Sequence, residues 1–150
     1  MRTGPPRDSG VVGAEEHYAA PMSSRIAQVA IEAEDPQLLS DFWCAVLDWV
    51  VLDWVVLEVE DDAVWCIGPA DGSQPGIDIA PTAETRSGKS RLHLDLRADG
   101  VSTEDELARL LGLGARRVDI GQGPEVTWTV LTDPEDNEFC LLGTSGADAG

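Results

Sequence analysis

The chain runs through one pattern of elements twice, and this repetition limits the folds open to it. A strand at Arg25–Ile31 is followed by a helix with one apolar stripe and then by three short strands. The same order returns from the alternating segment Arg91–Arg97 onward. Two βαβββ modules in tandem are therefore predicted, at about residues 25–81 and 91–142. Helices are too rare for a doubly wound parallel sheet, so we predict an α+β fold. Its curved, mostly antiparallel sheets would enclose a cleft, with the helices on the outer face.

Capping residues mark the ends of both predicted helices. Asp35 can cap the first helix, and Pro36 suits its first position. In the second module Thr103 and Glu106 fit a capping box, and Gly114 suits the C-terminal cap. These signals predict one helix in each module, packed on a sheet through its apolar stripe.

A tandem copy of Leu-Asp-Trp-Val-Val follows the first helix. We interpret the first copy as the end of the helix and its exit loop. The second copy would begin a strand that reaches about Glu60. Trp49 and Trp54 have three open roles: packing in the core, walling a pocket, or forming the seam of a homodimer.

The two ends of the chain read differently from the repeat. Residues 1–22 combine Gly, Pro and charge without apolar periodicity, which predicts a disordered leader. Met22 opens "MSSRIAQVAI", so both Met1 and Met22 are candidate starts. The domain is expected over residues 23–143, and the polar residues 144–150 are expected to form a flexible tail.

Charge, hydropathy and cysteine content limit the classes of partner and the cellular compartment that the sequence favours. The net charge is −18, with 10 basic against 28 acidic residues, which would repel a phosphate backbone and argues against nucleic acid. Such a balance favours a cationic ligand or simply gives a solvated acidic surface. No run reaches the roughly 18 uncharged apolar residues of a membrane span. Three cysteines without a C-x-x-C pair argue against a disulfide framework or a structural zinc site and for a reducing cytoplasm.

Three segments carry a resemblance to a known family: "DPQLLSDFWCAVLDW" after the first strand, "GKSRLHLDLR", and "DPEDNEFCLL" at the end. With the twofold βαβββ pattern, they resemble the vicinal oxygen chelate superfamily. More narrowly, they are similar to the glyoxalase-like domain of its glyoxalase, bleomycin-resistance and dioxygenase group. The resemblance covers roughly residues 24–143. It implies the fold more than an activity, because the superfamily holds several kinds of enzyme and also non-catalytic drug-binding proteins.

The resemblance also implies four metal-binding positions, one on the first and one on the last strand of each module. Carried over by position, these are Gln28 and His93 on the first strands and Asp78 and Cys140 on the last. Relatives usually have Glu at the last two positions. Glyoxalase-type chemistry needs a divalent metal and a carboxylate that moves a proton. Cys140 offers no carboxylate, and its thiolate would favour zinc. The expected cofactor is therefore either none or one divalent metal.

Three functions remain open at this point. We favour a small-molecule binding protein without the full metal site, because two of the four expected ligands are weak or missing. The alternative is a metal-dependent lyase or isomerase acting on a substrate with vicinal oxygens. A structural or regulatory dimer is the third. The first function needs a large cleft, most simply shared across a homodimer, with Trp43, Trp65 and Trp128 as aromatic walls. The residues predicted to line this cleft are Gln28, Asp78, Arg91, His93, Asp95, Trp128 and Cys140.

Overall fold

A computed structural model describes residues 22–56, 63–85, 87–118 and 127–143. The predicted tail and all of the predicted leader except Met22 lie outside these residues. The elements are β1 (Gln28–Ala33), α1 (Pro36–Leu47), β2 (Val50–Val56), β3 (Ala63–Gly68), β4 (Gly76–Pro81), β5 (Leu94–Leu96), α2 (Thr103–Leu113), β6 (Arg116–Arg117), β7 (Trp128–Thr132) and β8 (Glu138–Leu142). None of the helices in the described residues is long and apolar enough to cross a membrane.

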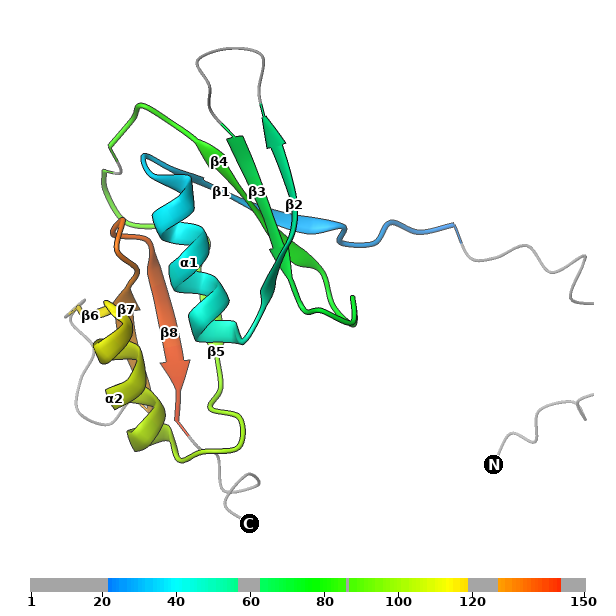
Figure 1. The fold of residues 1–150 in the computed structure, drawn as a ribbon. Helices are drawn as coiled ribbons and strands as arrows, with labels where there is room; N and C mark the ends of the chain where they lie inside the picture. The colour runs from blue at the N-terminus through cyan, green and yellow to red at the C-terminus, as the bar shows by residue number, and fades with distance from the viewer. Residues whose placement is uncertain (1–21, 57–62, 86, 119–126, 144–150) are drawn as a thin grey trace, which may run out of the picture.

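The strands form two four-stranded sheets with the same internal order. The first sheet runs β1-β4-β3-β2 and the second runs β5-β8-β7-β6. In each sheet the first strand of the module pairs in parallel with its last strand, and the other pairs are antiparallel (Figure 1). The predicted α+β fold with two tandem βαβββ modules is confirmed.

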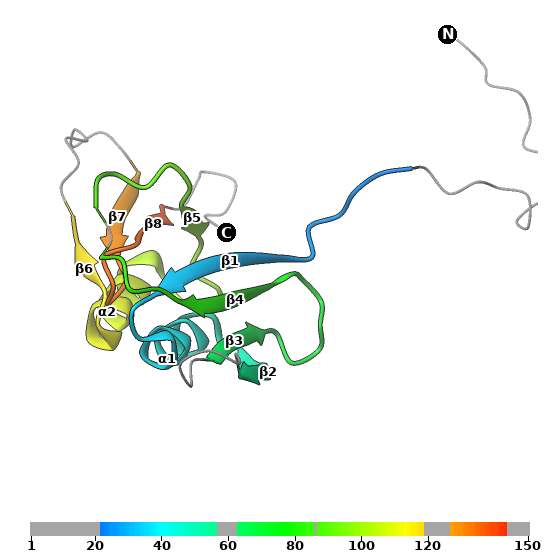
Figure 2. The same cartoon turned by 90° about the horizontal axis from the view of Figure 1, so that it is seen from above.

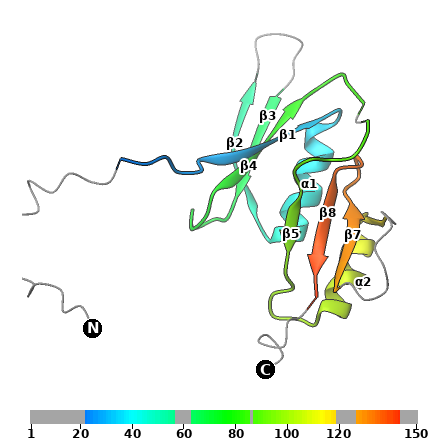
Figure 3. The same ribbon diagram turned by 180° about the vertical axis from the view of Figure 1, so that it is seen from behind.

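Both helices lie on the same side of the two sheets, which leaves the opposite faces uncovered by helix (Figures 2 and 3). The core joins the two modules through α1. The ring of Trp43 meets Phe139 of β8 edge to face at 5.0 Å between centroids, and it meets Phe42 at 5.2 Å. Leu39 and Ile79 are fully buried in the same cluster. One hydrophobic core therefore spans both modules, and it fixes how the two free faces sit relative to each other.

The helix caps confirm most of the sequence signals. Asp35 caps α1 by accepting a hydrogen bond from the backbone N–H of Leu38 at 3.1 Å, and Pro36 is the first helical residue. Gly114 ends α2 with a φ of 115°, as a C-terminal cap should. The predicted N-cap of α2 was wrong by one residue. Ser102 is the cap, and its hydroxyl accepts from the N–H of Asp105 at 3.1 Å.

The tandem Leu-Asp-Trp-Val-Val segment differs from its predicted division. Asp48 ends α1 in the left-handed conformation with a φ of 55°, so the chain reverses within one residue. Strand β2 accordingly begins at Val50, inside the first copy, and no exit loop separates it from the helix. The predicted end of this strand near Glu60 lies outside the described residues. The strand predicted at Arg91–Arg97 is likewise shorter, since β5 covers only Leu94–Leu96.

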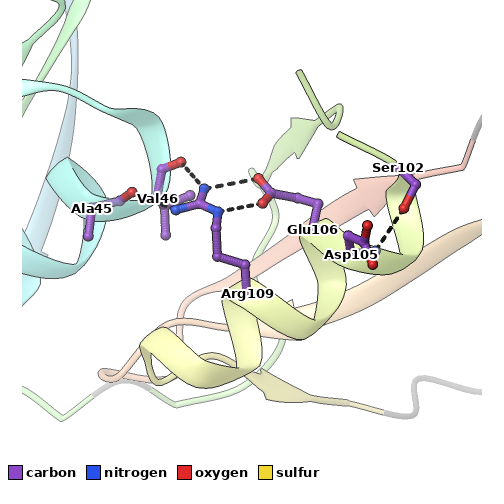
Figure 4. A network of polar contacts seen from close by, with 6 residues as sticks. All are labelled: Ala45, Val46, Ser102, Asp105, Glu106 and Arg109. Carbon is purple, nitrogen blue, oxygen red and sulfur yellow. Dashed lines mark hydrogen bonds and ion pairs between the residues drawn. The ribbon is translucent and has the colours of Figure 1, made fainter. Parts of the chain in front are cut away.

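A charged pair on α2 holds the end of α1 (Figure 4). Arg109 donates to the backbone carbonyl of Val46 at 2.8 Å and to that of Ala45 at 3.0 Å. The carboxylate of the buried Glu106 accepts two hydrogen bonds from the same guanidinium, from Nε at 2.5 Å and from Nη2 at 3.0 Å. α1 has no basic residue in its own last turn. Arg109 therefore supplies from the second module the cation that the C-terminal end of a helix favours.

The turn between β7 and β8 is built around a buried carboxylate. Asp133 is fully buried, and its oxygens accept from the backbone N–H groups of Glu135 and Asn137 and from the Asn137 side-chain amide, at 2.9–3.1 Å. Burial raises the pKa of Asp133, although these hydrogen bonds lower it. Asp136 has a φ of 66°, in the left-handed region that Asp adopts more readily than most residues other than Gly. The "TDPEDN" turn is thus a structural unit of the fold.

Candidate functional site

The free face of the first sheet carries two of the predicted residues. Ala30, Asp78 and Cys66 stand opposite one another on adjacent strands, so their side chains share one face. The neighbouring Ile77 and Ile79 are buried on the helix side. Gln28 is two residues before Ala30 and therefore lies on the same free face as Asp78.

A thiol and a carboxylate are paired on this face. Burial raises the pKa of Cys66 to about 11, and the hydrogen bond and charge of Asp78 add to the effect, with a further contribution from Asp53. A thiol with such a pKa is almost entirely protonated at neutral pH. Cys66 therefore acts as a hydrogen-bond donor to Asp78 and not as a nucleophile.

The second sheet has an equivalent pair with a histidine added. Asp95 of β5 stands opposite Cys140 of β8, and His93 lies two residues before Asp95. The Nδ1 atom of His93 is 3.0 Å from Oδ1 of Asp95. The ligand atoms of His93, Asp95 and Cys140 all lie within 4.8 Å of one another. Burial raises the pKa of Cys140, and the nearby Asp95 raises it further.

The four positions implied for a metal thus fall on two sheets. His93 and Cys140 come together on the second sheet, and Asp95 joins them. Gln28 and Asp78 lie on the first sheet, and Asp78 pairs with Cys66. Within the described residues, only His93, Asp95 and Cys140 form a group of three acidic, histidine or cysteine ligands. This set contains sulfur, so it does not fit the oxygen and imidazole donors that glyoxalase-type metal chemistry favours.

The other predicted cleft residues lie near the second sheet. Arg91 lines a hollow of about 350 Å³ together with Lys89, Ser90 and His93. Trp128 is the first residue of β7, is partly exposed, and pairs in register with Leu142 of β8.

A larger cavity of about 830 Å³ lies between β1, the segment that follows β4, and the start of β8. Its size is in the range of cavities that hold drug-sized molecules. His93 is the one predicted cleft residue in its lining, and Trp43, predicted as an aromatic wall, reaches it too. The apolar part of the wall comes from Val29, Ile31, Leu92, Leu94 and Phe139.

The polar part of this cavity is acidic, and sequence reasoning missed the residues that make it so. They are Glu32, Glu34, Glu84, Glu135, Asp136 and Glu138, and no Lys or Arg is among the described lining residues. Three of them serve the fold: Glu135 accepts from the backbone N–H of Glu34 at 2.6 Å and of Asp35 at 2.8 Å, Asp136 pairs with Arg116 at 2.6 Å, and Glu34 accepts from Thr85 at 3.4 Å.

Glu32, Glu84 and Glu138 also line the cavity. The alternation of the strands could have identified two of them. Glu32 has the same parity as Gln28 on β1, and Glu138 is two residues before Cys140 on β8. No sequence signal placed Glu84, because it lies in the irregular segment after β4.

Two tandem βαβββ modules, each with its first strand paired in parallel with its last, match the vicinal oxygen chelate fold. The model of the glyoxalase-like domain family matches residues 28–142, so the chain belongs to the glyoxalase-like domain family. The family predicted from the sequence is thereby confirmed. No curated protein sequence matches the chain significantly.

Several solved structures share this fold at low sequence identity. A mutant of the fosfomycin resistance protein FosX from Listeria monocytogenes, complexed with Mn(II) and a dihydroxypropylphosphonic acid, has a TM-score of 0.65 at 12% identity, covering 84% of this chain and 97% of that one. The trypanothione-dependent glyoxalase I of Leishmania major has a TM-score of 0.59 at 14% identity, over 81% and 87%. The antibiotic-binding protein TnmS3 of Streptomyces sp. CB03234 has a TM-score of 0.57 at 20% identity, over 82% and 98%. At these identities the likeness concerns the fold.

Proposed function

We propose that this protein binds a small cationic organic molecule in the 830 Å³ cavity, without the four-ligand metal site of metal-dependent relatives. The acidic lining of the cavity is the observation that carries the proposal. A positively charged group would meet Glu32, Glu84 and Glu138, while the apolar part of the molecule would pack on Val29 and Phe139. Organic cations that combine a charged group with a ring system fit such a wall.

The charge of the cavity sets the class of ligand. Carboxylates gathered on a concave surface attract cations and repel anions more strongly than the same groups spread over an open surface. The FosX structure contains a dihydroxypropylphosphonic acid, which is anionic, and an anion of that kind is disfavoured here. TnmS3 is an antibiotic-binding protein, and antibiotic sequestration is one form of the proposed function.

A pair of fluorescent probes with opposite charge tests the proposal. Ethidium is a planar cation, and anilinonaphthalene sulfonate is an anion of similar size. We expect ethidium to bind and the sulfonate to bind at least tenfold more weakly at low salt. Glu32→Gln and Glu84→Gln should each weaken ethidium by about fivefold, which corresponds to about 1 kcal/mol. Asp41→Asn removes an exposed charge on α1 and should leave binding unchanged. Equal affinity for both probes would refute a cation site.

A metal-dependent lyase or isomerase remains the alternative, and the cluster of His93, Asp95 and Cys140 is the observation that favours it. Turnover of methylglyoxal with glutathione after addition of nickel or zinc would support it. The same preparation without turnover would leave only the binding function.

We also propose that the protein is a cytoplasmic homodimer. Its three cysteines, Cys44, Cys66 and Cys140, are all free thiols, as a reducing compartment favours. The edge strand β2 exposes a row of large apolar side chains, which we call the β2 patch: Val50, Val51, Leu52, Trp54 and Val55. Exposed apolar rows on an edge strand are typical of surfaces that pair with another chain.

A further inference from the structure

A basic hollow adjoins the acidic cavity. The hollow of about 350 Å³ is lined by Lys89, Ser90, Arg91 and His93, and no carboxylate is among its described lining residues. Ser90 and His93 line the 830 Å³ cavity as well, so the two spaces are neighbours. A ligand that fills the larger cavity can therefore extend one group to the two cationic side chains of the smaller hollow.

The segment between β4 and β5 brings these basic residues to the cavity. Strand β4 ends at Pro81 and β5 begins at Leu94, and the described chain between them passes on the side of the sheets opposite the helices (Figures 2 and 3). Gly88 has a φ of 74°, which residues with a side chain rarely adopt, and it turns the chain directly before Lys89. The same segment carries Glu84 of the acidic cavity. One irregular segment thus supplies charges of both signs to neighbouring spaces.

The two cations of the hollow are not engaged by the acidic groups of the protein. Lys89 and Arg91 are exposed, and neither forms an ion pair with any residue that the structure describes. Arg109, by contrast, is held by Glu106. The sequence has 28 acidic residues for 10 basic ones, so a lack of carboxylates does not explain why these two cations are left without a partner. They remain available to an anionic group from outside the chain.

The residue types of the hollow favour a carboxylate as that anionic group. A guanidinium presents parallel N–H donors that match the two oxygens of a carboxylate, and an ammonium adds a second, more mobile charge. A ligand that is only anionic gains little from the hollow, because the acidic lining beside it repels the rest of the molecule. The two neighbouring spaces therefore favour a molecule that carries both charges.

We propose that the ligand is a zwitterion, an organic cation that also carries a carboxylate. Its cationic group faces Glu32 and Glu84 in the larger cavity, and its carboxylate is bound by Arg91 and Lys89 in the 350 Å³ hollow. The inference rests on the proposed function, because it needs a cation in the larger cavity. It narrows the class of ligand and assigns Arg91 and Lys89 as the residues that determine this specificity.

Rhodamine 110 and rhodamine 123 provide a matched pair of probes. They share one cationic ring system and differ in a single group, which is a free carboxylate in rhodamine 110 and its methyl ester in rhodamine 123. Fluorescence anisotropy at low salt measures the affinity of each dye for the full-length protein. We expect rhodamine 110 to bind more tightly than rhodamine 123 by about fivefold or more.

Single variants separate the contributions of the two spaces. Arg91→Gln should reduce the affinity for rhodamine 110 to that for rhodamine 123, and it should not weaken rhodamine 123. Lys89→Gln should reduce the same preference to a smaller extent. Glu84→Gln should weaken both dyes alike. As a control, Arg117→Gln removes an equal charge from an exposed position on β6 and should keep the preference.

The outcomes distinguish this inference from the proposed function. Binding of rhodamine 123 without a preference for rhodamine 110 would overturn the inference and leave the cation site in place. A preference that survives in the double variant Lys89→Gln, Arg91→Gln would also overturn it. So would an equal loss of preference in Arg117→Gln, because the effect would then come from net charge. If neither dye binds, the proposed function fails and this inference fails with it.

Discussion

The indole Nε1 of Trp43 donates a hydrogen bond to Oδ2 of Asp133 at 3.1 Å, across 90 positions of sequence. Both side chains are fully buried. The bond joins the first helix to the turn between the last two strands, and so it joins the two modules. In the same turn, Glu135 binds the backbone N–H groups of Glu34 and Asp35 just before α1. The "DPEDN" turn therefore has a structural role in holding the two modules together.

Replacing Asp133 with Asn tests this assignment. The amide keeps the shape of the side chain but replaces one acceptor oxygen with a donor. Either the Trp43 indole, which binds Oδ2, or the backbone N–H groups of Glu135 and Asn137, which bind Oδ1, then lose their buried partner. We expect Asp133→Asn to lower the free energy of unfolding in urea by about 1–3 kcal/mol. Asp99→Asn makes the same change in an exposed loop and should cost less than about 0.5 kcal/mol. Equal urea midpoints for the two variants would contradict the assignment.

Arg109 offers a second test of the contact between modules. Arg109→Met keeps much of the side-chain length but removes the donors to Ala45 and Val46 and leaves the buried Glu106 unpaired. We expect a loss of about 2 kcal/mol in the free energy of unfolding. Arg117→Met, at an exposed position on β6, should be close to neutral.

A double variant shows whether the cost comes from the unpaired carboxylate. If it does, Glu106→Gln should cost less in the Arg109→Met background than in the original protein. Strictly additive losses in the free energy of unfolding would mean that the two side chains act separately. The proposed joint role of Arg109 and Glu106 in holding the end of α1 would then be wrong.

Local signals and the internal repeat made the fold predictable. Asp35, Pro36 and Gly114 mark helix ends through their own backbone chemistry, so their roles could be read without tertiary information. The start of β2 could not be predicted in this way, because it depends on Asp48 adopting a left-handed conformation within the apolar repeat. At the site, alternation placed His93 and Cys140 on one face, but the cavity depends on how two sheets meet through Trp43 and Phe139. The spacing of residues in the sequence does not indicate how the two sheets pack against each other.

The β2 patch gives a prediction about assembly. Trp54 is 55% exposed and its ring lies 6.1 Å from that of Trp65 at a tilted angle, so much of its apolar surface is available to a second copy. We expect the protein to run in light scattering as a dimer, at twice the 16.0 kDa of one chain. Trp54→Glu places a charge in the contact and should give a monomer. Val101→Glu, at a position 53% exposed before α2, should leave the dimer intact. A dimer that survives Trp54→Glu would exclude the β2 patch as the interface.

Cys66 should respond to alkaline pH in a way that identifies its partner. With a pKa of about 11, only about one molecule in a thousand has the thiolate at pH 8, about a hundredfold fewer than for a pKa near 9. In a variant with Cys44→Ser and Cys140→Ser, iodoacetamide should therefore react slowly at pH 8, and the rate should climb until pH reaches about 11. Asp78→Asn removes the negative charge and should raise the rate at pH 8. Asp41→Asn, beside Cys44 and not Cys66, should not.

The same pKa has a consequence for stability. Because the folded state raises it, the proton on Cys66 contributes stability that is fully present below the ordinary thiol pKa. This contribution is lost as pH rises through about 11. Cys66→Ser, with no titrating thiol, should therefore lose less stability than the original protein between pH 9 and 11 when urea midpoints are compared. Parallel losses in the two proteins would show that Cys66 keeps an ordinary pKa, and the pairing with Asp78 would then be incorrect.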